Sequence, residues 1–312
     1  MTDPAPDQRA LVPEDVPGLD LPLGRRLDLP GRGTTFIREI AGPSPGAPTV
    51  LLIHGWMASG GLNWFQAFTP LSKHFRVVAP DLRGHGRGIK NWRRFRLSDC
   101  ADDCAAIIDE LGTGPVIVVG YSLGGPVAQL LWRRHPDKVA GLVLSATSDS
   151  FIPGIQQRVV FVGMMAAAAG TTRTGQFLMT VPAAFGRQIP LRGSGRPDTF
   201  RRWAPQEFQR HDLRMVFEAG NAIATFSSRR WIRHVDVPTA VLVTTRDRAV
   251  LPVSQLRLAL HIPHATIHRL DEGHTAPMLE SFGPAVTDAC LEVSREVEGV
   301  RGTVSRLRSV HD

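Results

Sequence analysis

A stretch of five residues, Gly-Tyr-Ser-Leu-Gly at positions 120–124, decides the fold of this chain. It follows the short apolar run Pro115–Val119 and precedes a helix-compatible segment, Pro126–His135. A strand, a sharp turn and a helix in this order lift a serine hydroxyl out of the end of a sheet, and the glycines leave room for the strained turn. The pattern predicts that Ser122 is a nucleophile.

The partners that a serine nucleophile requires lie downstream of Ser122. A hydroxyl is a poor nucleophile at neutral pH and needs an adjacent base, which in turn needs an orienting carboxylate. Asp247 follows an apolar run that ends at Thr244, and His274 lies on a loop after the last such run. The chain order serine, aspartate, histidine fits a catalytic triad on an α/β sheet.

Other residues compete with Asp247 and His274. Asp149 follows the preceding strand-like run and is an alternative acid. His264 and His268 lie at the start of and inside the last run, where we expect edge or core residues rather than a catalytic base.

Around these residues, short β-branched runs alternate with helix-length amphipathic segments, which predicts a mostly parallel α/β sheet with helices on both faces. Residues 25–40 alternate around Gly31-Arg32-Gly33 and predict a hairpin. The expected strands are 49–54, 77–79, 116–119, 139–144, 239–244 and 266–270. The expected helices lie near 62–73, 98–111, 123–135, 252–261 and 277–297.

The alternation lapses between residues 149 and 236, where helical or irregular stretches replace the strands. We expect this segment to be a helical cap inserted into the sheet. The predicted organisation is a flexible N-terminal arm (1–24), a catalytic core (25–148 and 237–297), the cap (149–236) and a C-terminal tail (298–312).

The charge of the chain is concentrated in the cap. The formal net charge is +7, and residues 151–236 hold twelve arginines against five acidic residues, which equals the whole excess. A solvated arginine-rich surface and contact with an anionic membrane both explain this charge. No nucleic-acid-binding motif accompanies it, so we expect no nucleic-acid partner.

The cysteine content argues against disulfides and metal. The three cysteines, at 100, 104 and 290, form no paired motif, and Cys100 and Cys104 fit buried thiols on one helix face. No clustered metal ligands or glycine-rich phosphate loop occur, so we expect no metal and no cofactor. The acidic start and the absence of a long apolar run favour a cytoplasmic protein without a membrane span.

Two further motifs extend the pattern towards the N-terminus. His-Gly-Trp stands at 54–56 and Asp-Leu-Arg-Gly-His-Gly at 81–86. With the motifs at Ser122, Asp247 and His274, these make the chain from about Arg25 to about Val297 similar to the α/β-hydrolase fold family, in its carboxylesterase- and lipase-like branch with a serine nucleophile.

The resemblance implies a role for each matching residue. Ser122 would be the nucleophile, His274 the general base and then acid, and Asp247 the orienting carboxylate, since Asp-x-x-Val-x-Pro is the familiar form. The N–H groups of Trp56 and Leu123 would form the oxyanion hole, and loop 81–86 would brace the nucleophile turn. His54 and His85 are expected to hydrogen-bond loops in place.

The implied activity is hydrolysis of a carboxylic ester, with an apolar acyl group or a lipid-like substrate. A cofactor-free perhydrolase or a carbon–carbon bond hydrolase would use the same triad, and a non-catalytic binding protein could retain the fold. A serine at position 122 excludes the epoxide hydrolases and dehalogenases of this fold, which use an aspartate. The apolar stretch 154–170 fits an acyl-chain channel or a helix packed on the core. The residues expected to line the pocket are Trp56, Met57, Trp64, Tyr121 and Met278.

Overall fold

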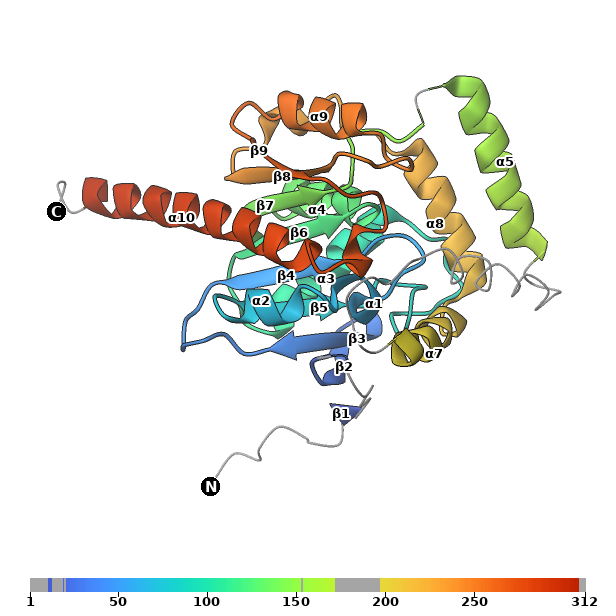
Figure 1. Ribbon diagram of the computed structural model, residues 1–312, viewed down its shortest axis with the longest axis horizontal. Coiled ribbons are helices and arrows are strands. Elements are labelled where there is room, and N and C mark those ends of the chain that lie inside the picture. The colour runs from blue at the N-terminus through green and yellow to red at the C-terminus, as the bar shows by residue number, and fades with distance from the viewer. Residues whose placement is uncertain (1–10, 13–18, 20, 153, 172–196, 309–312) are drawn as a thin grey trace.

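The computed structural model describes residues 11–12, 19, 21–152, 154–171 and 197–308, and Figure 1 shows their arrangement. A single sheet of nine strands crosses the molecule in the order β1-β2-β3-β5-β4-β6-β7-β8-β9. The strands are β1 (Leu11–Val12), β2 (Gly24–Leu29), β3 (Gly33–Ile40), β4 (Thr49–Ile53), β5 (Arg76–Pro80), β6 (Val116–Tyr121), β7 (Val139–Ser145), β8 (Thr239–Thr244) and β9 (Thr266–Leu270).

The sheet combines an antiparallel edge with a parallel body. The β2–β3 hairpin pairs antiparallel with β5, whereas β5, β4, β6, β7, β8 and β9 run parallel. The carboxyl ends of the parallel strands therefore meet along one edge, where ligands bind in open α/β sheets. The hairpin and the parallel α/β sheet predicted from the sequence are confirmed.

Helices cover both faces of the sheet because alternate side chains of each strand point to opposite faces. On one face α3 (Leu97–Glu110), α4 (Gly124–Arg134) and α9 (Pro252–His261) pack on the sheet. On the other face lie α1 (Gly60–Trp64), α2 (Phe68–Ser72) and the first part of α10 (Phe282–Arg308).

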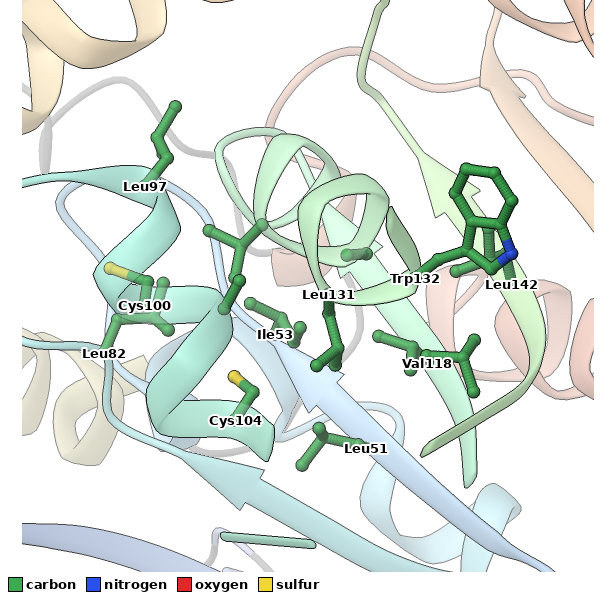
Figure 2. Close-up of a cluster of buried hydrophobic side chains, with 14 of the residues drawn as sticks. Leu51, Ile53, Leu82, Leu97, Cys100, Cys104, Val118, Leu131, Trp132 and Leu142 are labelled. Carbon is green, nitrogen blue, oxygen red and sulfur yellow. The ribbon is translucent and has the colours of Figure 1, made fainter. Parts of the chain in front are cut away.

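The two predicted thiols of α3 lie in the first of these cores. Cys100 and Cys104 are fully buried among Leu51, Ile53 and neighbouring side chains (Figure 2). Burial raises the pKa of both thiols, that of Cys100 well above its ordinary value. Both therefore stay protonated and act as small apolar side chains, as the sequence predicted.

Two helices differ from their expected bounds. The helix expected at 62–73 is divided into α1 and α2, because Pro70 lacks the N–H that a continuous helix would bond to residue 66, and the proline sits instead in the first turn of α2. The helix expected at 277–297 begins at Phe282, after the short 3₁₀ turn η4 (Ala276–Met278), and continues to Arg308. Most of the expected C-terminal tail is therefore helical.

The expected cap region is helical where it is described. Between β7 and β8 the chain forms α5 (Ile155–Thr171), α7 (Pro197–Gln209), α8 (Leu213–Thr225) and the 3₁₀ turn η3 (Ile232–His234). An isolated bridge pairs Ser150 with Ser227, so the outgoing and returning chains meet where they leave the sheet. In Figure 1, α8 lies between the sheet and the outermost helix, α5.

Most of the expected N-terminal arm lies outside the described residues, although Leu11–Val12 pairs with β2. Over the described ranges, none of the helices has the length and apolar character needed to cross a bilayer.

Candidate active site

Ser122 lies on a strained turn between β6 and α4. Its φ is 51°, in the left-handed region that side chains with a Cβ rarely adopt. The Ser122 N–H donates to the carbonyl of Ser145 on β7 (3.0 Å), and the Thr147 hydroxyl donates to the Ser122 carbonyl (2.8 Å). These bonds hold the unusual backbone conformation in place and orient the hydroxyl at the sheet edge.

The flanking glycines are required by contact distances. A Cβ on Gly124 would lie 2.1 Å from the carbonyl oxygen of Ile53, and one on Gly120 would lie 2.5 Å from that of Gly124. Both distances are far below a normal contact, so any side chain at either position would force β4, β6 and α4 apart.

The structure brings the three predicted triad residues together. The Nε2 of His274 lies 3.0 Å from the Oγ of Ser122, and its Nδ1 lies 2.8 Å from an oxygen of Asp247. A carboxylate only accepts, so Nδ1 carries the proton and Nε2 is left to accept the hydrogen of the serine hydroxyl. This is the arrangement in which histidine acts as a general base.

Asp247 is held by neutral donors in addition to the histidine. One carboxylate oxygen accepts from the backbone N–H groups of Ala249 (2.8 Å) and Val250 (2.9 Å), and the other accepts from the Thr244 hydroxyl (2.8 Å). Burial by itself would raise the pKa of Asp247, but the His274 contact and these hydrogen bonds outweigh it and lower the pKa. The carboxylate is therefore ionised at neutral pH.

Tyr121 was expected to line the pocket, but its side chain is buried and holds the backbone of His274. It is 3% exposed, and its hydroxyl donates to the His274 carbonyl (2.7 Å). Burial, followed by the charge of Asp247, raises its pKa well above the usual value, so the phenol remains a donor. The sequence placed Tyr121 at the site but not in this role, because nothing in the motif shows which way the ring points.

The expected oxyanion-hole groups lie beside the serine. A Cβ on Gly55 would be 3.4 Å from that of Ser122, so the segment after β4 borders the nucleophile. The Gly55 N–H donates to the side chain of Asn63 (3.0 Å), which fixes this segment. Within the described part of the chain, the N–H groups of Trp56 and Leu123 donate to no other group.

Three buried histidines join the segment after β4 to the cap. His54 accepts from the N–H of Leu82 (2.9 Å), and His211 accepts from the N–H of Gly86 (2.7 Å). Both rings pack against His85. Burial lowers the pKa of His54 and of His211 to about 4, and that of His85 well below its usual value. The expected structural role of His54 and His85 agrees with these contacts.

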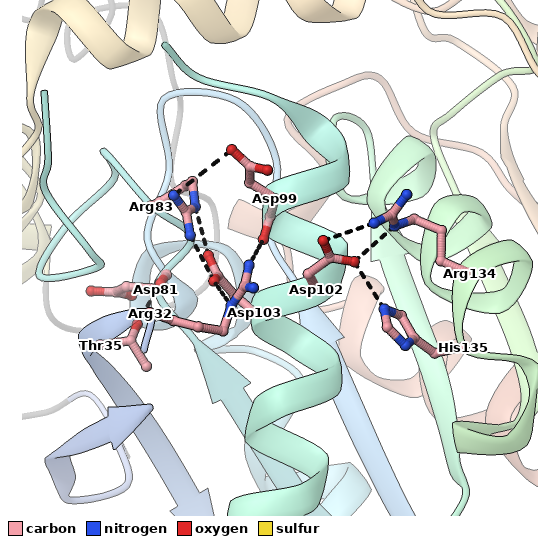
Figure 3. A network of polar contacts seen from close by, with 9 residues as sticks. All are labelled: Arg32, Thr35, Asp81, Arg83, Asp99, Asp102, Asp103, Arg134 and His135. Atoms are coloured by element: carbon pink, nitrogen blue, oxygen red, sulfur yellow. Dashed lines mark hydrogen bonds and ion pairs between the residues drawn. The ribbon is translucent and has the colours of Figure 1, made fainter. Parts of the chain in front are cut away.

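The loop at 81–86 is fixed by its charged side chains. Asp81 accepts from the N–H groups of Gly60 (2.7 Å) and Arg87 (2.8 Å). Arg83 donates two hydrogen bonds to Asp103 on α3, at 2.6 and 2.7 Å, and Arg32 also bonds Asp103 (Figure 3). The loop therefore connects the hairpin, α3 and the segment next to Ser122.

The remaining pocket predictions have different outcomes. Trp64 is fully buried and stacks on Phe282 in the core, so its assignment to the pocket is corrected: it lies on the face of α1 that packs against α10 and Tyr121. Met57 and Met278 are partly exposed: Met57 follows Trp56 directly, and Met278 is the last residue of η4, four positions after His274.

Trp56 connects the site to the cap. Its indole N–H donates to the carbonyl of Val216 on α8 (2.7 Å), and its ring meets that of Phe161 on α5 edge-on at 6.5 Å between centroids. A Cβ on Gly220 would lie 3.0 Å from the same indole. Residues of α5 and α8 therefore pack against Trp56 and form an apolar wall next to it.

The rival residues lie elsewhere. Asp149 is fully buried and faces His261 and Arg257, not His274. His264 contacts the carbonyl of Val237, and His268 pairs with Glu292. Of the two aspartates and three histidines considered for these roles, only Asp247 and His274 form a chain that reaches Ser122.

Comparison with known proteins agrees with this architecture. A family model described as the alpha/beta hydrolase fold matches residues 48–281. A pimeloyl-acyl-carrier protein methyl ester esterase of Chromobacterium violaceum is 30% identical over 238 residues, which cover 74% of this chain and 89% of the esterase. The magnesium-chelatase 30 kDa subunit of Rhodobacter capsulatus is 30% identical over 246 residues, 75% of this chain and 82% of that subunit. A crystal structure of a hydrolase from Pseudomonas aeruginosa superposes with a TM-score of 0.72 at 21% identity, over 86% of this chain and 97% of its own. The chain belongs to the α/β-hydrolase fold family.

Proposed function

We propose that the protein is a serine hydrolase that cleaves a carboxylic ester through an acyl-enzyme. The observation that carries the proposal is the continuous contact from Asp247 through His274 to Ser122, at 2.8 and 3.0 Å. The esterase named among the relatives supports the same reaction class. A non-catalytic role is disfavoured, because binding alone does not require a serine in a strained backbone conformation with its hydroxyl hydrogen-bonded to a histidine.

In the proposed reaction, the Ser122 oxygen attacks the ester carbonyl while Nε2 of His274 takes the hydroxyl proton. The N–H groups of Trp56 and Leu123 stabilise the oxyanion of the tetrahedral intermediate. Nε2 then returns the proton to the leaving alcohol. Water, deprotonated by the same nitrogen, releases the acid and restores the serine. Asp247 keeps Nδ1 protonated and stabilises the imidazolium at both stages.

An apolar acyl group fits the wall that faces the site. Trp56, Phe161 and Met165 approach one another at the junction of the segment after β4, α5 and α8, and none of the three carries a charge. We propose a medium-chain or lipid-like acyl ester as the substrate. A perhydrolase or a carbon–carbon bond hydrolase with the same triad is the alternative, and product analysis with and without peroxide separates these activities.

Labelling with a fluorophosphonate probe tests the nucleophile. The wild type should be labelled and Ser122→Ala should not. Ser72→Ala is the matched control, because this serine lies on α2 and, among the residues that the structure describes, its hydroxyl bonds only the carbonyl of Thr69. Equal labelling of Ser122→Ala and the wild type would refute the proposal.

A series of p-nitrophenyl esters of increasing acyl length tests the substrate class. We expect kcat/KM to rise from acetyl to medium-chain esters, since each buried methylene adds about 0.8 kcal/mol of transfer free energy. A preference for acetyl or charged acyl groups would overturn the apolar assignment and leave the triad proposal intact.

Contact between the arginine-rich cap and an anionic membrane also belongs to the proposed function. Several cap arginines have partners within the protein, however. Arg214 pairs with Glu218 (2.9 Å), and Arg229 lies 3.5 Å from the Asp149 carboxylate. Their charge is partly neutralised, so these arginines are poor candidates for the membrane contact.

A further inference from the structure

The loop Lys90–Arg96, here called the basic loop, exposes a tryptophan among unpaired cations. It reads Lys-Asn-Trp-Arg-Arg-Phe-Arg, and no acidic residue occurs between Gly88 and Ser98. Trp92 is 88% exposed. Over the described residues, the guanidinium groups of Arg93, Arg94 and Arg96 form no ion pair. Leaving an indole in water is unfavourable, because its large apolar surface gains no burial.

The cap holds the basic loop in a defined shape. Arg214 on α8 donates to the carbonyls of Asn91 (2.6 Å) and Arg93 (3.4 Å). On the same helix, Glu218 accepts from the N–H of Phe95 (2.7 Å). Backbone carbonyls and a backbone N–H of the basic loop are thus bonded to the same helix. The exposed Trp92 side chain is therefore carried by a backbone that α8 holds in place.

The outermost helix, α5, presents a second unusual surface. Its outward side chains include Ile155, Val159, Val160 and Met164, which are 70%, 64%, 63% and 56% exposed. The one charged residue of α5, Arg158, is only partly exposed and donates to the carbonyl of Ile152 (2.6 Å). The helix is about 25 Å long and stands at the edge of the molecule in Figure 1.

The basic loop and the exposed face of α5 adjoin each other. A hollow of about 340 Å³ is lined by Arg94 and Arg96 of the basic loop, by Val162 of α5 and by Phe226. Glu218 of α8 also lines it and is paired with Arg214. Residues three or four apart are neighbours on a helix surface, so the exposed Val159 lies next to Val162. Cations and an apolar helix face therefore form one continuous surface.

We infer that this surface docks the protein on an anionic lipid bilayer. Tryptophan favours the membrane interface, arginines attract anionic headgroups, and a helix with an apolar face inserts at the boundary between headgroups and acyl chains. An acidic protein would match the arginines, but it would leave Ile155, Val159, Val160 and Met164 without apolar partners. The bilayer satisfies both parts of the surface.

The link from membrane docking to a lipid-like substrate rests on the proposed ester hydrolysis. The docking itself does not depend on that activity. Phe161, on the inner side of α5, contacts Trp56 beside the serine, so docking through the outer side leaves the single helix α5 between the lipid and Trp56. A lipid-like ester could then reach Ser122 from the bilayer. Vesicle binding is measured without substrate, so its failure and the failure of ester hydrolysis are distinguishable.

Co-sedimentation with vesicles tests the docking surface. The wild type should bind equimolar phosphatidylcholine–phosphatidylglycerol vesicles at low salt and pure phosphatidylcholine vesicles much more weakly. Reversing one interfacial charge, Arg94→Glu, should weaken binding about tenfold or more. Trp92→Ala and Val159→Asp should each weaken it as well, while fluorophosphonate labelling and circular dichroism stay unchanged because all three side chains lie outside the core.

Two exposed positions away from this surface provide matched controls. Arg26→Glu on β2 repeats the charge reversal, and Leu260→Asp on α9 repeats the apolar-to-acid change at a residue that is 77% exposed. Neither control should alter vesicle binding. Equal losses in the controls, or no preference for anionic vesicles, would overturn the inference. Binding to immobilised polyglutamate that Arg94→Glu abolishes and Val159→Asp leaves intact, without vesicle binding, would overturn it in favour of an acidic protein partner.

Discussion

Two buried aspartates follow neighbouring strands, and each faces the Nδ1 of a histidine. Asp247 follows β8 and lies 2.8 Å from His274, whereas Asp149 follows β7 and lies 2.7 Å from His261. The pKa of both carboxyls is lowered, because hydrogen bonds and nearby cations outweigh the opposing effect of burial. By local geometry the two pairs are nearly equivalent.

Their surroundings differ in charge. Apart from the histidine, Asp247 is bound by neutral donors, whereas Asp149 also faces the guanidinium groups of Arg257 (3.1 Å) and Arg229 (3.5 Å). Arginines that already neutralise a carboxylate leave little charge to stabilise an imidazolium. The Asp247 pair can therefore activate a base, and the Asp149 pair serves as an anchor.

Asp149 also ties together both stems of the cap. Its carbonyl accepts from the N–H of Ser228 (2.9 Å), and Arg229 reaches it from the returning stem, while Arg257 comes from α9. The two pairs differ in what the second histidine nitrogen reaches and in the cations that compete for the carboxylate, and these differences support the proposed catalytic role of the Asp247 pair alone.

The largest expected effect is that of Ser122→Ala. Removing the hydroxyl should lower kcat by on the order of 10⁴- to 10⁶-fold on any ester that the wild type hydrolyses. The melting temperature should change little, because alanine keeps the Cβ and only the hydroxyl, with its one hydrogen bond to His274 named above, is removed. Retained activity in a purified, folded variant would show that Ser122 is not the nucleophile. The Asp247–His274 pair would then have no catalytic role through this serine.

The next effect in size is that of Asp247→Asn, which should lower kcat about 10⁴-fold by favouring the wrong histidine tautomer. Asp149→Asn is the matched substitution in the other pair. It should change kcat by less than about tenfold, because His261 is not part of the chain of contacts from Asp247 through His274 to Ser122. Comparable kinetic losses in the two variants would contradict the assignment of the triad acid.

Asp149→Asn should instead lower stability. The substitution leaves Arg257 and Arg229 without their carboxylate, and both are partly exposed, so water offsets part of the loss. We expect a decrease of about 1 to 3 kcal/mol in the free energy of unfolding, measured by urea titration. Unchanged stability would show that Asp149 is not the cap anchor.

The pH dependence of stability separates the aspartates from the buried histidines. His54 and His211 have their pKa lowered from 6.5 to about 4, so the unfolded chain binds protons that the folded chain does not. Their contribution is complete above pH 6.5 and is lost as the pH falls towards 4. The lowered pKa of Asp149 gives a contribution that is complete above 3.8 and is lost below it.

Thermal unfolding of the wild type and Asp149→Asn across this range measures the two windows. Both proteins should lose stability between pH 6.5 and 4, and the difference between them should stay constant there and shrink only below about 3.8. A difference that disappears already at pH 6 would show that the Asp149 carboxyl is not the group responsible for it.

The smallest expected effect is that of Tyr121→Phe. Loss of the hydrogen bond to the His274 carbonyl should lower stability by about 1 kcal/mol and kcat by no more than about tenfold, because the imidazole remains held by Asp247. Thermal unfolding and ester kinetics measure both quantities. A loss as large as that of Asp247→Asn would show that the phenol acts on the reacting atoms directly.

The strands could be predicted closely, and the helices less so. The bounds of β8 follow from its apolar run, because a parallel strand buried on both faces leaves a continuous apolar signature. The bounds of the edge strand β9 also match the expected 266–270, although it contains His268 and Arg269 and is buried only at Leu270. The break between α1 and α2 depends on a single missing N–H at Pro70, which a pattern of apolar residues does not show. The pocket residues were the least predictable, since Trp64 and Tyr121 face the core and closeness in sequence does not give direction.

Contacts between the cap and the core were also beyond the sequence. His211 accepts from Gly86 across 125 residues, and Glu207 accepts from the hydroxyl of Ser59 across 148. No spacing rule connects such residues, because their meeting depends on where the whole cap lies over the sheet. His211 stands next to Asp212, the N-cap of α8, and Glu207 lies within α7, and neither position in the sequence indicates the distant partner.

The sequence by itself determined the residues on which the proposed chemistry rests: a serine on a glycine-flanked turn, an acid and a histidine in the right chain order, and a parallel sheet to carry them. Local composition is enough for this, because strand periodicity, turn sterics and side-chain chemistry are short-range properties. Only the tertiary structure decided which aspartate faces the histidine beside Ser122 and which cap arginines pair with a carboxylate. These outcomes depend on distances between side chains far apart in the chain, and such distances are set by strand order, loop paths and packing.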